Sequence, residues 1–139
     1  MIKKLSAVKP FGIDALAIIR ICTGILILLH GKMVFDSGIM NGMAESMSKD
    51  LAMPFPLLMA YLAKGSEFFG GLSFALGLFT RFVSIPLTIT MAVAAFGAHH
   101  GQINGEGEHA FLFLLIFAAF FFIGSGKWSV DYLLKSIKR

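Results

Sequence analysis

The chain has 139 residues, of which 57% are hydrophobic and 14% charged, and its formal net charge is +4. A soluble domain carries roughly 25% charged residues, so this composition excludes an ordinary soluble fold and indicates an integral membrane protein. The basic residues gather at the ends of apolar segments instead of forming a stripe, which excludes a nucleic-acid-binding surface. The single cysteine, Cys22, excludes an intramolecular disulfide and a paired-cysteine redox centre.

Four apolar stretches follow one another along the chain, and we expect each to form a helix that crosses the membrane. They cover about 14–34, 56–79, 82–98 and 108–124. Each is near or slightly below the ~20 residues that cross a ~30 Å hydrocarbon core. The expected fold class is therefore all-α: an integral membrane four-helix transmembrane bundle that forms one domain over residues 1–139.

The N-terminal segment imitates a secretory signal peptide, because Lys3 and Lys4 precede an apolar run. That run contains Arg20, however, and no small-x-small cleavage site follows it. We therefore expect the segment to stay on the protein as its first span.

The longest connection, residues 36–55, allows two interpretations. Asn41 can cap a short helix on which Met43, Met47 and Leu51 share one face, and such a helix would lie at the membrane interface as a lid. The alternative is a loop with scattered methionines.

The positions of lysine and arginine predict the orientation in the membrane. The N-terminal segment, the turn at Thr80–Arg81 and the C-terminal tail hold most of them, whereas the loops 36–55 and 99–109 hold only Lys49. The positive-inside rule then places both termini in the cytoplasm and the two longer loops outside.

Glu67 lies near the middle of the second span, where an ionised carboxylate costs several kcal/mol unless a partner neutralises it. Arg20 on the first span and Lys64, one turn from Glu67, are the candidate partners, and His30 lies toward the outer side. Glycines would let the two helices approach closely enough for Arg20 to reach Glu67. The glycines expected to have this structural role are Gly24, Gly31, Gly70 and Gly71.

This polar cluster is either a functional site or a buried ion pair that fixes the helix register. On the third span, Thr90, Gly97 and His100 share a face that would close the site. The histidines and acids of the 99–109 loop match no metal-ligand spacing, so we expect no metal and no haem. The candidate ligand-binding residues are Arg20, His30, Lys64, Glu67 and His100.

Three segments of the sequence resemble the DoxX family of small bacterial membrane proteins. Residues 20–32 resemble its first-helix pattern, with Arg20, Gly24, His30 and Gly31. Residues 67–81 resemble its E-x-x-G-G … L-G-L-x-T-R segment, and residues 124–131 its closing G-x-G-R-x-S-L-D, with lysine in place of arginine and valine in place of leucine. The segments occur in the family's order and span nearly the whole chain.

The resemblance implies a four-helix bundle in the bacterial inner membrane with both termini inside. Family members look like subunits or partners of membrane redox systems, including thiosulfate:quinone oxidoreductases. The matching segments also place Arg81 and Asp131 at the cytoplasmic face. We predict that Arg81 pairs with Asp131 or Asp14 as a structural latch between helix ends.

Three functions compete for this sequence. The first is a membrane subunit of a redox system that binds a quinone-like molecule at the polar cluster and takes electrons from a partner protein, because the sequence holds no flavin or nucleotide motif. The second is a proton or small-solute transporter gated by Glu67, which with four spans would need a homo-oligomer. The third is a scaffold for a membrane partner. Membrane lipids surround the protein in all three.

Overall fold

The computed structural model describes residues 15–137, all of whose regular structure is helical. The first helix of this range, α2 (Ala15–Gly31), continues as a 3-10 turn, Lys32–Phe35. The remaining helices are α3 (Ser37–Leu51), α4 (Pro56–Gly65), α5 (Gly71–Leu76), α6 (Thr80–Ala92), α7 (Glu108–Ile123) and α8 (Val130–Ile137). The expectations for Lys3, Lys4 and Asp14 fall outside the described residues.

Two π-helical turns interrupt the longer helices without breaking them. The turn Ser66–Gly70 joins α4 to α5, so that residues 56–76 form one continuous rod. The turn Val93–Ala98 extends α6 in the same way. Inserted π-helical turns widen a helix by one residue and are frequent at functional sites. The four ranges predicted as spans are thus helical, with bounds that differ by a few residues.

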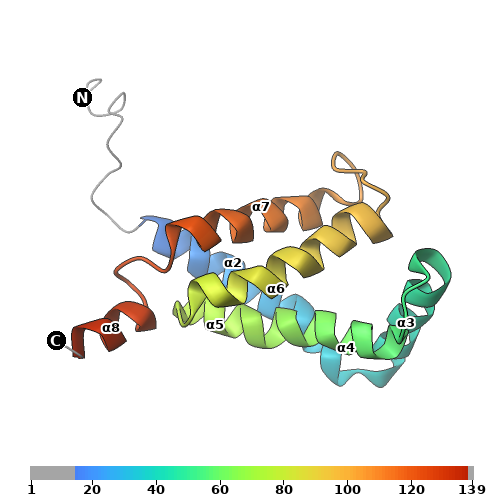
Figure 1. The fold of residues 1–139 in the computed structure, drawn as a ribbon, viewed down its shortest axis with the longest axis horizontal. Coiled ribbons are helices and arrows are strands. Elements are labelled where there is room, and N and C mark those ends of the chain that lie inside the picture. The colour runs from blue at the N-terminus through green and yellow to red at the C-terminus, as the bar shows by residue number, and fades with distance from the viewer. Residues whose placement is uncertain (1–14, 138–139) are drawn as a thin grey trace.

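The long helices lie side by side, with α3 and α8 at opposite ends of the molecule (Figure 1). α2 packs against α5 and the Ser66–Gly70 turn, and α6 packs against α7. The core between them consists of buried apolar side chains, namely Ile27, Phe74, Leu87, Met91, Phe117 and Phe120.

Short local signals end and begin these helices. Gly77 has φ +69, a left-handed conformation that glycine adopts without strain, and it ends α5. Pro56 occupies the first turn of α4, where its missing N–H costs nothing. Asp36 caps α3 by accepting hydrogen bonds from the backbone N–H groups of Gly38 and Ile39 at 2.9 and 3.1 Å. The expected cap at Asn41 is therefore wrong, because the helix begins at Ser37.

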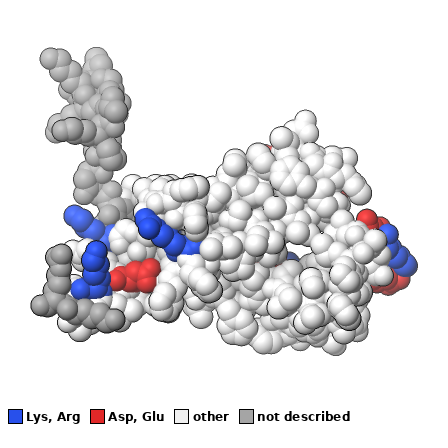
Figure 2. All heavy atoms as spheres, viewed as in Figure 1, with Lys and Arg blue, Asp and Glu red and all other residues white. Residues whose placement is uncertain are grey.

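The surface is unusually apolar for a water-soluble protein, and two charged side chains lie in the interior beside the apolar core. Arg20 and Glu67 are buried, whereas large apolar side chains such as Ile18, Leu62 and Phe122 are exposed. Figure 2 shows charged side chains at the two ends of the molecule and an uncharged belt between them. Two helices, Ala15–Phe35 and Thr80–Ala98, are long and apolar enough to cross a membrane, and Glu108–Ile123 is a shorter apolar helix. This arrangement suits a protein whose middle contacts hydrocarbon.

Candidate ligand-binding site

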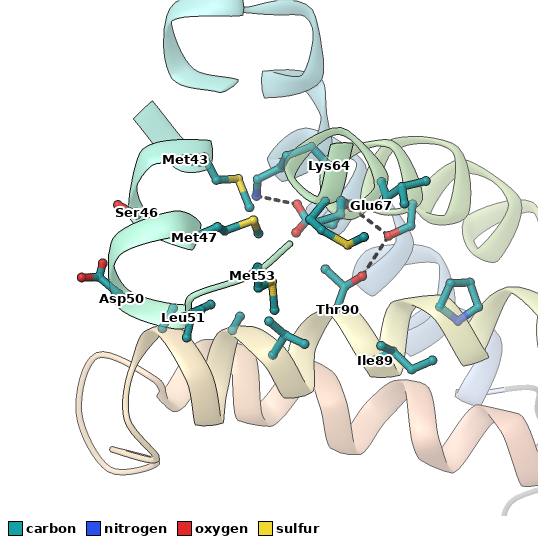
Figure 3. A pocket seen from close by; sticks show the side chains of 18 residues that line it. Met43, Ser46, Met47, Asp50, Leu51, Met53, Lys64, Glu67, Ile89 and Thr90 are labelled. Atoms are coloured by element: carbon teal, nitrogen blue, oxygen red, sulfur yellow. Dashed lines mark hydrogen bonds and ion pairs between the residues drawn. The ribbon is translucent and has the colours of Figure 1, made fainter. Parts of the chain in front are cut away.

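A cavity of about 520 Å³ lies under α3, between that helix, α4 and the second half of α6. Its walls are mostly apolar. Figure 3 shows Lys64, Glu67 and Thr90 on the side that faces α3, whereas Ser46 and Asp50 lie on α3 itself. The lining residues come from three segments: Met43, Ser46, Met47, Asp50, Leu51 and Met53; Met59, Leu62, Ala63, Lys64, Ser66 and Glu67; and Pro86, Ile89, Thr90, Val93, Ala94 and Ala98. We call this space the α3 cavity.

An ion pair forms the polar side of the α3 cavity. Nζ of Lys64 lies 2.7 Å from Oε2 of Glu67, and the two side chains are only 15% and 4% exposed. The i, i+3 spacing places both on one face of the helix, across the junction of α4 with the π-helical turn. Because each charge is largely withdrawn from water, each depends on the other for neutralisation.

A hydroxyl pair lies beside the ion pair and joins two helices. Oγ of Ser66 lies 3.0 Å from Oγ1 of Thr90, and Ser66 also donates to the carbonyl oxygen of Ala63 at 2.8 Å. A hydroxyl has one proton and accepts hydrogen bonds as well. With Ser66 donating to Ala63, Thr90 is the donor to Ser66. The two side chains therefore attach the turn Ser66–Gly70 to α6 at the cavity wall.

Thioether and other apolar side chains form the rest of the cavity. Met43, Met47 and Leu51 point from α3 toward Lys64, Glu67 and Thr90 in Figure 3. Met53 and Met59 complete this wall, and the packing of Met40, Met47 and Ala60 holds α3 on α4. Methionine is flexible and polarizable, so such a wall adapts to ligands of varied shape. Most of this segment, residues 37–51, is therefore a helix and not a loop with scattered methionines, and that helix covers the cavity.

The helix α2 closes the site from behind, on the side away from α3. Gly31 packs so closely that a Cβ there would lie 2.2 Å from the backbone nitrogen of Phe68. A Cβ on Gly24 would lie 2.5 Å from the nitrogen of Ala75, and one on Gly71 2.7 Å from the nitrogen of Leu28. Gly70 faces the other way, toward the side chains of Val83 and Leu87 on α6. The missing side chains allow the backbones to meet.

The expected pair between Arg20 and Glu67 is wrong. Arg20 is buried at the opposite end of α2, where it donates to the carbonyl oxygens of Ser125 and Trp128, the latter at 2.6 Å. A Cβ on Gly77 would lie 2.8 Å from Cζ of Arg20, so Arg20 faces the end of α5. Arg20 thus holds the connection between α7 and α8 against the helices and does not line the cavity.

The expected latch between Arg81 and Asp131 does not form as a direct ion pair. Asp131 accepts hydrogen bonds from the backbone N–H groups of Phe79 and Thr80 at 2.8 and 3.2 Å. Arg81 donates to the carbonyl oxygen of Phe122 at 3.2 Å. Both residues therefore do connect helix ends, but through the backbone. The alternative partner, Asp14, lies outside the described residues.

The two histidines proposed as ligand-binding residues do not line the α3 cavity. The ring of His30 lies edge-on to Phe113, with centroids 6.4 Å apart, and the residue is exposed. His100 is an exposed loop residue with φ +49. Among the described residues, no group of three or more histidines, cysteines or acids is arranged to hold a metal ion.

Sequence reasoning missed part of the cavity. Ser66 and the methionines Met53 and Met59 gave no signal, because they lie on different segments whose approach depends on the tertiary fold. The regular spacing of Met43, Met47 and Leu51 did reveal the face of α3 that covers the site. Lys64, Glu67 and Thr90 were expected near one another, and the structure places all three on the cavity wall.

Comparison with known proteins identifies the family. The family model for DoxX matches residues 15–100, a range that contains every residue lining the α3 cavity. An uncharacterized protein of Haemophilus influenzae is 31% identical over 123 residues, which cover 84% of this chain and 87% of that protein. The chain belongs to the DoxX family, whose members are membrane proteins. No solved structure shows significant similarity to it.

Proposed function

We propose that this protein is a membrane-embedded subunit of a redox system and binds a quinone-like molecule in the α3 cavity. One observation carries the proposal: a largely apolar cavity of about 520 Å³ has a buried ion pair and a hydroxyl pair on one side. Small-molecule sites typically measure about 300–1,000 Å³ and combine apolar walls with a few polar groups that fix the ligand's orientation.

The chemistry of a quinone fits the two sides of the cavity. Its carbonyl oxygens accept hydrogen bonds, and the donor at hand is the ammonium of Lys64, which has three N–H groups and gives one of them to Glu67. Its ring and tail are apolar, as are the methionine wall of α3 and the side chains of Ile89 and Val93. Reduction of a quinone takes up protons, and Glu67 lies where a carboxyl group can hand one on.

The redox role requires a partner, which we propose to be a second protein. The sequence has one cysteine and no flavin or nucleotide motif, so electrons would reach the bound quinone from elsewhere. The resemblance of DoxX proteins to subunits of membrane redox systems supports this role.

The proposed location is the bacterial inner membrane, crossed four times. The crossing segments are α2, the rod 56–76, the rod 80–98 and α7. The uncharged belt of Figure 2, which exposes many large apolar side chains, supports this topology. The distribution of lysine and arginine favours a cytoplasmic location for both termini. The α3 cavity then opens toward the outer half of the membrane.

The test measures quinone retained by the full chain after extraction in mild detergent, by native mass spectrometry. We expect the wild-type chain to retain quinone and the double variant Lys64→Met, Glu67→Met to lose it. The double variant leaves no unpaired charge behind, so it should fold. The matched control is Glu45→Met with Lys49→Met, which removes an ion pair from the exposed face of α3. Equal retention by both double variants, or no quinone on the wild-type chain, would contradict the proposal.

A further inference from the structure

A second cavity lies at the α8 end of the molecule, remote from the α3 cavity. It is an open hollow of about 510 Å³, bordered by the start of α6, the connection after α7, and α8. Its lining residues are Phe79, Thr80, Arg81, Phe82, Ile123, Gly124, Ser125, Gly126, Asp131, Tyr132 and Lys135. We call it the α8 cavity. Nothing in the proposed function makes use of it.

Two cationic side chains give the α8 cavity a positive character. Arg81 and Lys135 line it, and among residues 15–137 neither forms an ion pair with an acidic side chain. The one carboxylate in the lining, Asp131, has both oxygens engaged by the backbone N–H groups of Phe79 and Thr80. Lysine and arginine gather at this end of the molecule in Figure 2.

A backbone carbonyl group holds the guanidinium of Arg81 in place and leaves its other N–H groups accessible. Nη2 donates to the carbonyl oxygen of Phe122 at 3.2 Å, which orients the guanidinium. Gly124 lies against it, and a Cβ there would come within 3.4 Å of Nε. Gly124 has φ +85, so a side chain at this position would be both strained and close to the guanidinium. The remaining donors of Arg81 are available to a ligand.

The same cavity has an apolar border of the kind that contacts acyl chains. Phe79, Phe82 and Ile123 line it and are 65%, 75% and 51% exposed. Tyr132 also lines it, and Trp128 is exposed nearby on the segment that leads into α8. Tyrosine and tryptophan are enriched at the level of lipid headgroups. The α8 cavity thus combines cations with apolar surface at the expected depth of the membrane–water interface.

We propose that the α8 cavity binds the phosphate of an anionic phospholipid. The phosphate lies between Arg81 and Lys135, where the guanidinium donates charge-assisted hydrogen bonds and the ammonium adds a point charge. The acyl chains follow Phe79 and Phe82 along the outside of α6. Basic pockets at the cytoplasmic ends of membrane helices bind such headgroups in this way.

The experiment titrates phosphatidylglycerol, or phosphatidylcholine with the same acyl chains, onto the full chain in detergent and counts bound lipids by native mass spectrometry. About 1 kcal/mol per cation corresponds to ~5-fold in affinity. We expect Lys135→Gln to weaken phosphatidylglycerol binding ~5-fold, and Arg81→Gln with Lys135→Gln to reduce it to the level of phosphatidylcholine. Lys127→Gln is the control, because it removes the same charge at the same end of the chain but does not line the cavity.

Three outcomes would overturn the assignment. Equal binding of the two lipids by the wild-type chain would remove the role of the phosphate charge. An equal loss in Lys127→Gln would show an unspecific effect of net charge. Displacement of phosphatidylglycerol by millimolar inorganic phosphate would make the site one for free phosphate. The Lys135→Gln variant tests the assignment even if Arg81→Gln fails to fold. Lys135 is exposed on α8, so we expect its replacement to leave the fold intact.

Discussion

At the scale of single residues, the ion pair Lys64–Glu67 determines both the stability of the cavity wall and its chemistry. A buried ion pair adds little net stability, because the desolvation of two charges offsets most of their attraction. Removing one partner has a larger effect, since it leaves the other charge buried alone. The 4% exposure of the Glu67 side chain makes this asymmetry strong here.

We predict that Lys64→Met and Glu67→Met each lower the free energy of unfolding by about 3–5 kcal/mol. The double variant should return to within about 1 kcal/mol of the wild-type value, because methionine replaces both charges with apolar volume. Unfolding in detergent micelles, followed by circular dichroism, measures the four values. Additive losses in the double variant would mean that the two residues do not act as a pair.

For Arg20, the sequence predicts the face of the helix on which the residue lies but not the residues that it contacts. Arg20, Gly24, Ile27 and Gly31 recur at the spacing of one helix face, and all four are buried in α2. This spacing does not determine how far one of two antiparallel helices is shifted along the other. The contact of Gly31 with Phe68 and of Gly24 with Ala75 sets that register and leaves Arg20 opposite Gly77. Gly77 is about 15 Å along the helix from Glu67, at 1.5 Å per residue.

At the scale of elements, glycine contacts determine how closely α2 approaches the rod 56–76. We predict that Gly31→Ala lowers the free energy of unfolding by about 1–3 kcal/mol, because its Cβ would meet the backbone at Phe68 and Glu67, which cannot rotate away. Gly42→Ala is the matched control in α3, where a Cβ meets nothing within 4 Å. Gly42→Ala should raise the free energy of unfolding by about 0.5–1 kcal/mol, because alanine is more favourable than glycine in a helix interior. Both changes are measured by thermal unfolding, and a neutral Gly31→Ala would contradict the close approach.

The helix α3 is held on the cavity by few side chains, among which Met47 is buried. We predict that Met47→Ala loosens α3 alone, because truncation of a buried methionine costs about 2–5 kcal/mol and the core under α6 and α7 is separate. Hydrogen exchange should become faster across residues 37–51 and stay unchanged in α6 and α7. Ser48→Ala, on the exposed side of α3, serves as control. Faster exchange throughout the molecule would show that α3 unfolds only with the rest.

The elements themselves were largely predictable, whereas their irregular parts were not. Apolar runs that begin at Pro56 and end at Gly124 gave two of the helix bounds, and these signals are local. The second span was predicted to end at Phe79, whereas the helix ends at Leu76, before Gly77. The π-helical turns at Ser66–Gly70 and Val93–Ala98 depend on the helices that pack against them, so no local sequence pattern predicts them. The α3 cavity lies beside both turns, which explains why its outline could not be drawn from sequence.

At the scale of the whole molecule, the two ends differ in charge and in the sites they carry. The α3 end holds the lid helix and the α3 cavity, and the α8 end holds Arg81, Lys127 and Lys135. The belt between them exposes leucine, isoleucine and phenylalanine. If this belt is embedded in hydrocarbon, the two ends contact opposite sides of the membrane. The ligand of one cavity and the lipid of the other then approach from different leaflets.

The topology can be tested by asking whether α3 and α8 lie on the same side of the membrane or on opposite sides. The rod 56–76, the rod 80–98 and α7 lie between them, so three crossings put Ser48 and Ser136 on opposite sides. In a Cys22→Ser background, a membrane-impermeant maleimide should label Ser48→Cys on spheroplasts. It should label Ser136→Cys only after the membrane is permeabilised, because the basic C-terminal end stays inside. Labelling of both positions on intact spheroplasts would mean that one of the three segments does not cross. The reverse pattern would keep the crossings and invert the protein, which would place the α3 cavity on the cytoplasmic side.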